Sequence, residues 1–187
     1  MGALALGLLV AAASCGGDGY EVSELPAIVL QASEAPEGTV HERDESGTRA
    51  LREFSVSGQE RLQGEGFVDG YATVFGPTGG VTTHLEVTSG AMVFEDGSGA
   101  EASMAVVLQD VEGRLIEATE MSADGLGAES AGLSGPVEGD ARQRSALLYV
   151  WRTDNLVLFV IASALLESAP SPEVILGLAE TMDSRAS

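Results

Sequence analysis

The chain has 187 residues, 44% of them hydrophobic, and a formal net charge of −20 from 29 acidic and nine basic residues. A body this acidic repels phosphate backbones and anionic lipid surfaces, which argues against nucleic-acid binding. The length is sufficient for one domain with its own hydrophobic core, and a single cysteine excludes an intramolecular disulfide.

The N-terminus carries a short apolar run over residues 3–13, which has no charged side chain. A membrane-spanning helix needs roughly 20 apolar residues, so the h-region of a signal peptide is the better interpretation. The run ends in Ala12-Ala13-Ser14-Cys15. This tetrapeptide resembles the lipobox of bacterial lipoproteins, although Ala12 replaces the usual Leu and no Lys or Arg precedes the run.

The lipobox resemblance implies a division of the N-terminus into two parts. Residues 1–14 are then a signal peptide, and residues 15–24 are a lipidated tether. Cys15 would carry a diacylglycerol and often an N-acyl group such as palmitate, and the protein would sit on the extracytoplasmic face of the membrane in the cell envelope. Two alternatives stay open: an ordinary signal peptide cut elsewhere, and a cytosolic protein with an apolar N-terminus.

We assign residues 25–187 to one domain, whose first part gives weak signals. The apolar residues 27–30 predict a short strand, and residues 34–52 are polar, charged and interrupted by Pro and Gly, which predicts a loop. Residues 57–64 are compatible with a short helix that glycine weakens.

From Phe67 the pattern is stronger. Residues 67–75 predict a strand and residues 76–80 a turn. Residues 81–94 alternate as a half-buried strand does, and Gly90 suggests a bend or bulge. Ser98 and Glu101 have the spacing of a capping box before a helix. The buried face of that strand and the apolar stripe of that helix consist, respectively, of Leu85, Val87, Ala91 and Val93, and of Met104, Val107, Leu108 and Val111.

The C-terminal part repeats this order. Residues 112–145 are rich in Gly and Ser and predict one strand near 115–121. Two strands over 146–152 and 156–163, joined by a tight turn at 153–155, are apolar on both faces and should lie in the centre of a sheet. Ser171-Pro172-Glu173 predicts the start of a final helix. Its buried stripe is Ile175, Leu178, Ala179 and Met182.

The order strand–turn–strand–helix thus occurs twice, at about 67–111 and 146–186. We therefore predict an α+β fold with a mainly antiparallel sheet built from two ββα units and with the helices packed on one face. Over residues 67–186 the layout, including Gly70-Tyr71, Leu126-Gly127 and Trp151, is similar to uncharacterised actinobacterial-type envelope lipoproteins and to extracellular sensor domains of receptor kinases. That resemblance implies the location and the fold, and no particular activity.

Aromatic side chains give one candidate ligand site. Tyr71, Phe75, Tyr149 and Trp151 would line a groove for a small apolar ligand or a peptide if one face of the sheet were open. The alternative is that these four residues belong to the core.

Catalytic and metal chemistry find little support in the sequence. The two histidines, His41 and His84, have no serine beside them on a recognisable nucleophile elbow, so a hydrolase is the least favoured class. No paired His or Cys spacing suits zinc, and no acidic loop has the calcium-binding spacing. We therefore assign no catalytic residue, no metal and no cofactor.

The leading hypothesis is a non-enzymatic, lipid-anchored extracytoplasmic domain. Its expected partners are the membrane, through Cys15, and a small ligand or an envelope protein of unknown identity. The alternative is an accessory or structural surface lipoprotein without a pocket.

Overall fold

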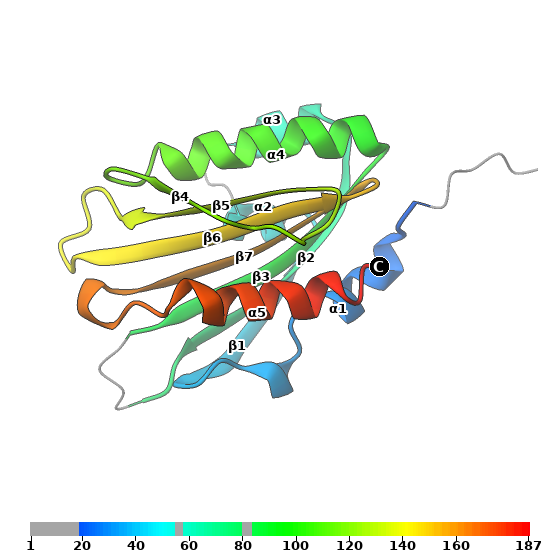
Figure 1. Ribbon diagram of the computed structural model, residues 1–187. Coiled ribbons are helices and arrows are strands. Elements are labelled where there is room, and N and C mark those ends of the chain that lie inside the picture. Colours follow the sequence, from blue (N-terminus) through cyan, green and yellow to red (C-terminus); the bar gives the residue numbers. More distant parts are fainter. Residues whose placement is uncertain (1–18, 55–57, 80–83) are drawn as a thin grey trace, which may run out of the picture.

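All strands in the described part of the chain belong to one sheet. The computed structural model describes residues 19–54, 58–79 and 84–187, and its seven-stranded antiparallel sheet has the order β1–β2–β3–β7–β6–β5–β4 (Figure 1). The strands are β1 (Thr39–Ser46), β2 (Phe67–Pro77), β3 (Glu86–Phe94), β4 (Thr119–Met121), β5 (Glu129–Pro136), β6 (Arg144–Thr153) and β7 (Leu156–Leu165). The helices are α1 (Leu25–Ile28), α2 (Thr48–Phe54), α3 (Gln59–Gly64), α4 (Gly97–Glu112) and α5 (Pro172–Asp183), with 3₁₀ turns η1 (Val22–Glu24), η2 (Ala32–Glu34) and η3 (Leu166–Ser168).

The two predicted ββα units form the middle of this sheet. β2 and β3 lead into α4, and β6 and β7 lead into α5. The units meet where β3 pairs antiparallel with β7, so that Gly90 lies opposite Phe159. The predicted α+β fold with a mainly antiparallel sheet is confirmed.

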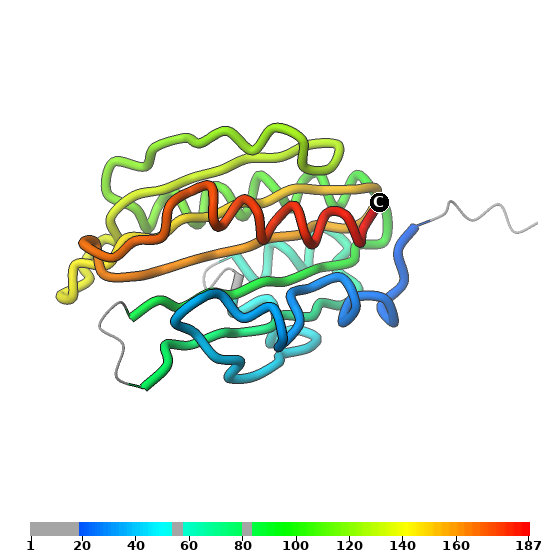
Figure 2. The backbone as a smooth tube through the Cα atoms, turned by 60° about the horizontal axis from the view of Figure 1, so that its bottom comes forward, coloured from blue at the N-terminus to red at the C-terminus, as the bar shows by residue number. Residues whose placement is uncertain are grey.

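The helices cover both faces of the sheet, so the expectation of one covered face is wrong. Met92 and Phe94 pack with α4, α2 and α3 on one side, whereas Ala91 and Val93 between them pack with α1 and α5 on the other. Figures 1 and 2 show α4 and α5 on opposite sides of the sheet. The physical reason is that the central strands are apolar on both faces, and each face must be shielded from water.

The N-terminal third differs most from its prediction. The apolar residues expected as a strand at 27–30 instead form the end of α1 and the segment after it, where Ile28, Val29 and Leu30 are buried. The segment expected as a loop contains β1, an edge strand whose side chains are mostly exposed. Charged side chains suit an edge strand because they discourage pairing with another chain, and they also remove the apolar alternation that reveals a strand.

The first long helix begins earlier than its predicted capping box. Asp96 is the N-cap of α4, and its Oδ1 accepts hydrogen bonds from the backbone N–H groups of Ser98 and Gly99 at 2.9 and 3.0 Å. The Ser98 hydroxyl itself donates to Asp96 at 2.6 Å, so it serves the cap rather than forming it. α5 begins at Pro172 after Ser171, as the sequence predicts.

Both ends of the domain are tied together beside the β6–β7 turn. The backbone N–H of Tyr20 donates to Asn155 Oδ1 at 2.8 Å, and the Tyr20 hydroxyl donates to the carbonyl of Ala186. Asn155 Nδ2 in turn donates to the carbonyl of Phe94 at 3.0 Å. The chain is therefore bound to the sheet from Tyr20 onward, inside the range 15–24 expected as a tether, while Cys15 lies outside the described residues.

Candidate binding site

The four aromatic residues predicted to line a groove lie on one face of the sheet, beneath α1 and α5. Phe75, Tyr149 and Trp151 are at most 1% exposed and belong to the core on that face. Tyr71 is partly buried against the same core, and its hydroxyl donates a hydrogen bond to Asp44. The structure thus brings the four residues together in a covered layer, which agrees with the alternative that they are core.

A partly enclosed cavity lies on the opposite face, between α2 and the C-terminal end of α4. Its volume is about 190 Å³. Leu148 on β6 and Ile161 on β7 are register partners in its lining, and Ala146 and Ser163 are the next pair on that face. We name it the α2–α4 cavity. Its full lining is Glu53, Val111, Arg114, Leu115, Val137, Arg144, Ala146, Leu148, Ile161 and Ser163.

The α2–α4 cavity exists because the helices on this face leave part of the sheet uncovered. α2 packs on β1, β2 and β3, whereas α4 packs on β3, β5, β6 and β7 and ends at Glu112. The chain then turns back so that Leu115 bridges to Val137, which closes one wall. The small side chains of Ala146 and Ser163 leave room that larger residues would fill.

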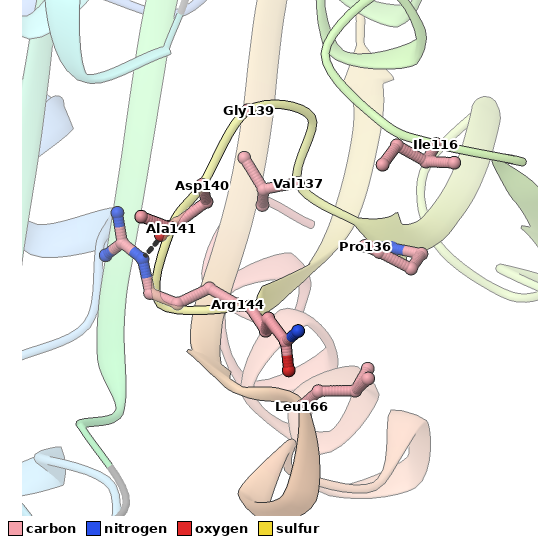
Figure 3. Close-up of a pocket in the computed structure, with 9 residues that line it drawn as sticks. Ile116, Pro136, Val137, Gly139, Asp140, Ala141, Arg144 and Leu166 are labelled. Atoms are coloured by element: carbon pink, nitrogen blue, oxygen red, sulfur yellow. Dashed lines mark hydrogen bonds and ion pairs between the residues drawn. The ribbon is translucent and has the colours of Figure 1, made fainter.

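A second, more open hollow adjoins the cavity at the hairpin between β5 and β6. Its volume is about 510 Å³, and it shares Val137 and Arg144 with the α2–α4 cavity. Figure 3 shows Ile116, Pro136 and Leu166 around it, while the guanidinium of Arg144 points away toward Asp140. Ile116 and Leu166 are about half exposed, at 48% and 54%, so this hollow is a shallow apolar surface rather than an enclosed site.

The charged side chains that line the α2–α4 cavity are all paired with opposite charges. Arg144 donates through Nε to Asp140 at 2.6 Å and through Nη1 to Glu86 at 3.0 Å. Arg114 Nη2 lies 3.5 Å from Asp110 Oδ2, and Glu53 Oε1 accepts from Arg43 at 2.9 Å. The hydrogen bond to Asp140 outweighs desolvation and raises the pKa of Arg144, which therefore stays charged. The cavity thus has an aliphatic lining, and the charged side chains at its rim are neutralised by their ion-pair partners.

The surroundings of the two histidines do not match the geometry of a catalytic triad. His41 Nε2 lies 3.0 Å from Asp44 Oδ1 at the exposed edge of the sheet, and its ring packs edge-on against Phe75. His84 is exposed and precedes β3. Within the described residues no hydrogen bond joins either histidine to a serine. The same part of the chain shows no group of three or more His, Cys, Asp or Glu side chains that could hold a metal ion.

The hydrogen bonds at Asp44 lead to a pH prediction. Burial alone would raise the pKa of Asp44, but hydrogen bonds from His41, Thr73 and Tyr71 outweigh it and hold this pKa below its ordinary value. The ionised carboxylate therefore stabilises the fold above the ordinary aspartate pKa of about 4, and this stabilisation is lost as the pH falls through the lower, folded-state value.

We expect Asp44→Asn to lower the free energy of unfolding above about pH 5, and to lower it by a shrinking amount below about pH 4. Urea unfolding of both proteins across this range measures the difference. Tyr71→Phe, which removes one of the three donors, should give a weaker pH dependence of the same sign. A difference between wild type and Asp44→Asn that does not change with pH would contradict the role given to these hydrogen bonds.

Comparison with known proteins gives a structural match only. No protein-family model matches the sequence, and no curated protein matches it. The structure is similar to the crystal structure of the extracellular domain of PknH from Mycobacterium tuberculosis, with a TM-score of 0.64 and 11% sequence identity. The alignment covers 91% of this chain and 98% of that chain. At this identity the similarity shows a shared fold, as the resemblance to receptor-kinase sensor domains implies.

The residues of the α2–α4 cavity were not identified from the sequence. Leu148 and Ile161 read as ordinary core positions, and Arg114 and Arg144 stand in stretches without a recognisable motif. One local signal was available: Ala146 and Ser163, at the ends of two otherwise bulky strands, are small.

Among the described residues no helix has the length and hydropathy needed to cross a membrane.

Proposed function

We propose that this protein is a non-enzymatic, lipid-anchored extracytoplasmic domain that binds a small ligand in the α2–α4 cavity. The main support for this proposal is the α2–α4 cavity, which is partly enclosed, has an aliphatic lining and is bordered by a few polar groups. Binding sites commonly combine these properties. The presence of this cavity favours the proposal over a structural lipoprotein without a pocket.

Two observations support the location. Ala12-Ala13-Ser14-Cys15 resembles a lipobox, and the fold is similar to that of an extracellular domain. The attachment point of the N-terminus is also compatible with a lipid anchor, because Tyr20 is bonded to the end of the domain that carries Asn155. Cys15 to Gly19 spans at most about 14 Å when extended, so this end would lie close to the membrane.

The cavity would then face away from the membrane. Ala146 lies at the cavity, and Asn155 lies at the anchored end of the sheet. The strand residues between them span about 25–30 Å at the usual rise per residue. Figure 1 shows the N-terminal segment and the β5–β6 hairpin at opposite ends of the sheet. A ligand would therefore enter from the aqueous side.

The lipid anchor is tested by mass spectrometry of the membrane fraction of cells that express the full chain. We expect a mature protein that begins at Cys15 and carries the mass of a diacylglycerol. Cys15→Ser should abolish that mass and shift the protein out of the membrane fraction. An unmodified, soluble wild-type protein that begins at another residue would contradict the anchor and leave the cavity untouched.

Ligand binding is tested with matched six-carbon probes, 1-hexanol, hexanoate and hexylamine, against the full chain that carries Cys15→Ser. We expect at least one probe to bind saturably, and Ala146→Leu, which fills the cavity, to weaken that binding at least tenfold. Ala141→Leu is the matched control, because it makes the same change in the hairpin hollow outside the cavity. Failure of all three probes to bind, or equal loss in both variants, would contradict the site.

A further inference from the structure

The size and lining of the α2–α4 cavity restrict the shape of its ligand. About 190 Å³ is roughly six times the 30 Å³ that a water molecule occupies in the liquid, and it lies below the roughly 300 Å³ at which drug-sized pockets begin. The apolar lining residues are aliphatic, namely Val111, Leu115, Val137, Ala146, Leu148 and Ile161. A short aliphatic chain matches this space, and a fused-ring or drug-sized molecule does not.

The charges around the cavity restrict the head group of the ligand. Each of the three charged lining residues has an opposite charge beside it: Arg144 has Asp140 and Glu86, Arg114 has Asp110, and Glu53 has Arg43. A charged head group drawn into the cavity would have to break one of these pairs or lose water without gaining a partner. Either event is unfavourable, because a desolvated charge without a partner costs far more than a neutral polar group.

We infer that the α2–α4 cavity selects an uncharged aliphatic group and discriminates against both carboxylates and amines of the same length. This inference rests on the proposed function, since it concerns the ligand of the same cavity. Because the two guanidiniums at the rim are already paired with carboxylates, they offer no free partner to an acid, and the paired carboxylates offer none to an amine. A hydroxyl or ester head can instead bond to rim groups without disturbing the ion pairs.

The three six-carbon probes test this selectivity directly, because they share one chain and differ in the charge of the head group at pH 7. We expect 1-hexanol to bind at least about tenfold more tightly than hexanoate or hexylamine in titrations followed by NMR. Equal or tighter binding of either charged probe would overturn the inference while leaving the cavity as a binding site. Absence of binding by all three would instead contradict the proposed function on which the inference rests.

A charge-releasing variant provides the reciprocal test. Asp140→Asn removes one carboxylate from Arg144 and keeps an oxygen that can accept the hydrogen bond of the Arg142 backbone N–H, which lies 2.7 Å from Asp140 Oδ1. We expect the binding of hexanoate to strengthen several-fold in this variant and that of 1-hexanol to stay unchanged. Asp154→Asn is the matched control, because it makes the same change in net charge at the exposed β6–β7 turn.

Comparison of Asp140→Asn with Asp154→Asn shows whether the ion pairs at the rim set the selectivity of the cavity. Strengthening of hexanoate binding in Asp140→Asn alone would support the inference. An equal gain in Asp154→Asn would attribute the discrimination to net charge rather than to the paired rim, and no gain in either variant would show that the pairing of Arg144 does not set the selectivity. Either of these two results would overturn the inference.

Discussion

Replacement of Trp151 by alanine is expected to lower the free energy of unfolding by about 3–5 kcal/mol, the usual cost of removing a large buried aromatic side chain. Trp151 is fully buried on β6, in the core layer beneath α5 and beside the 122–128 loop. Gly127 lies so close that a Cβ there would stand 3.0 Å from the Trp151 ring. The cavity left by truncation therefore has little chance to collapse.

Trp151→Phe is the informative control for this prediction. The indole Nε1 is buried, and within the described residues it has no hydrogen-bond partner. Replacing the indole with phenyl therefore removes a polar group that gains nothing from burial, and the loss of stability should be clearly smaller than for alanine. Chemical unfolding measures both variants. A stable Trp151→Ala protein that no longer binds the aliphatic probes would place Trp151 in an open groove instead of the core.

Gly90→Ala is expected to destabilise the fold by about 3 kcal/mol, at the upper end of typical overpacking costs. Gly90 is a regular residue of β3, opposite Phe159 on β7, and a Cβ at this position would lie 2.3 Å from the Phe159 ring. Phe159 is fully buried, so its ring cannot move aside without disturbing its neighbours. The glycine thus permits an aromatic ring to cover the backbone at the centre of the sheet.

A double-mutant cycle separates this contact from the general effect of glycine. Phe159→Leu should cost stability in the wild-type protein and much less in the Gly90→Ala background, because the smaller side chain relieves the overlap with the new methyl group. Urea unfolding of the four proteins gives the coupling energy. Additive effects would contradict the ring contact as the reason for glycine at this position.

The two ββα units could be predicted because their signals are local. The alternation of Leu85, Val87, Ala91 and Val93 and the start of α5 at Ser171-Pro172 depend on residues near one another in the chain. The central strands are apolar on both faces, and this pattern already indicated that helices must cover both sides of the sheet. The prediction of a single covered face disregarded that requirement, and it left Phe75, Tyr149 and Trp151 with an expected open face.

The cavity and the edge strand β1 could not be predicted because they depend on distant parts of the chain. β1 is held by pairing with β2, from Thr39 opposite Pro77 to Ser46 opposite Tyr71, and its own side chains show no apolar period. The α2–α4 cavity results from where α4 ends relative to α2, and its ion pairs join residues as far apart as Glu86 and Arg144. No spacing within one segment encodes that arrangement.

We place the ligand between α2 and α4 rather than beside the buried aromatic residues. Methyl NMR of the full chain carrying Cys15→Ser, titrated with 1-hexanol, distinguishes these two positions. We expect saturable shifts of the methyl groups of Val111, Leu115, Val137, Leu148 and Ile161, which line the cavity. Saturable shifts of Leu156, Leu158 and Val160 on the face of Trp151, or no saturable shift at all, would show that the ligand does not bind in the α2–α4 cavity.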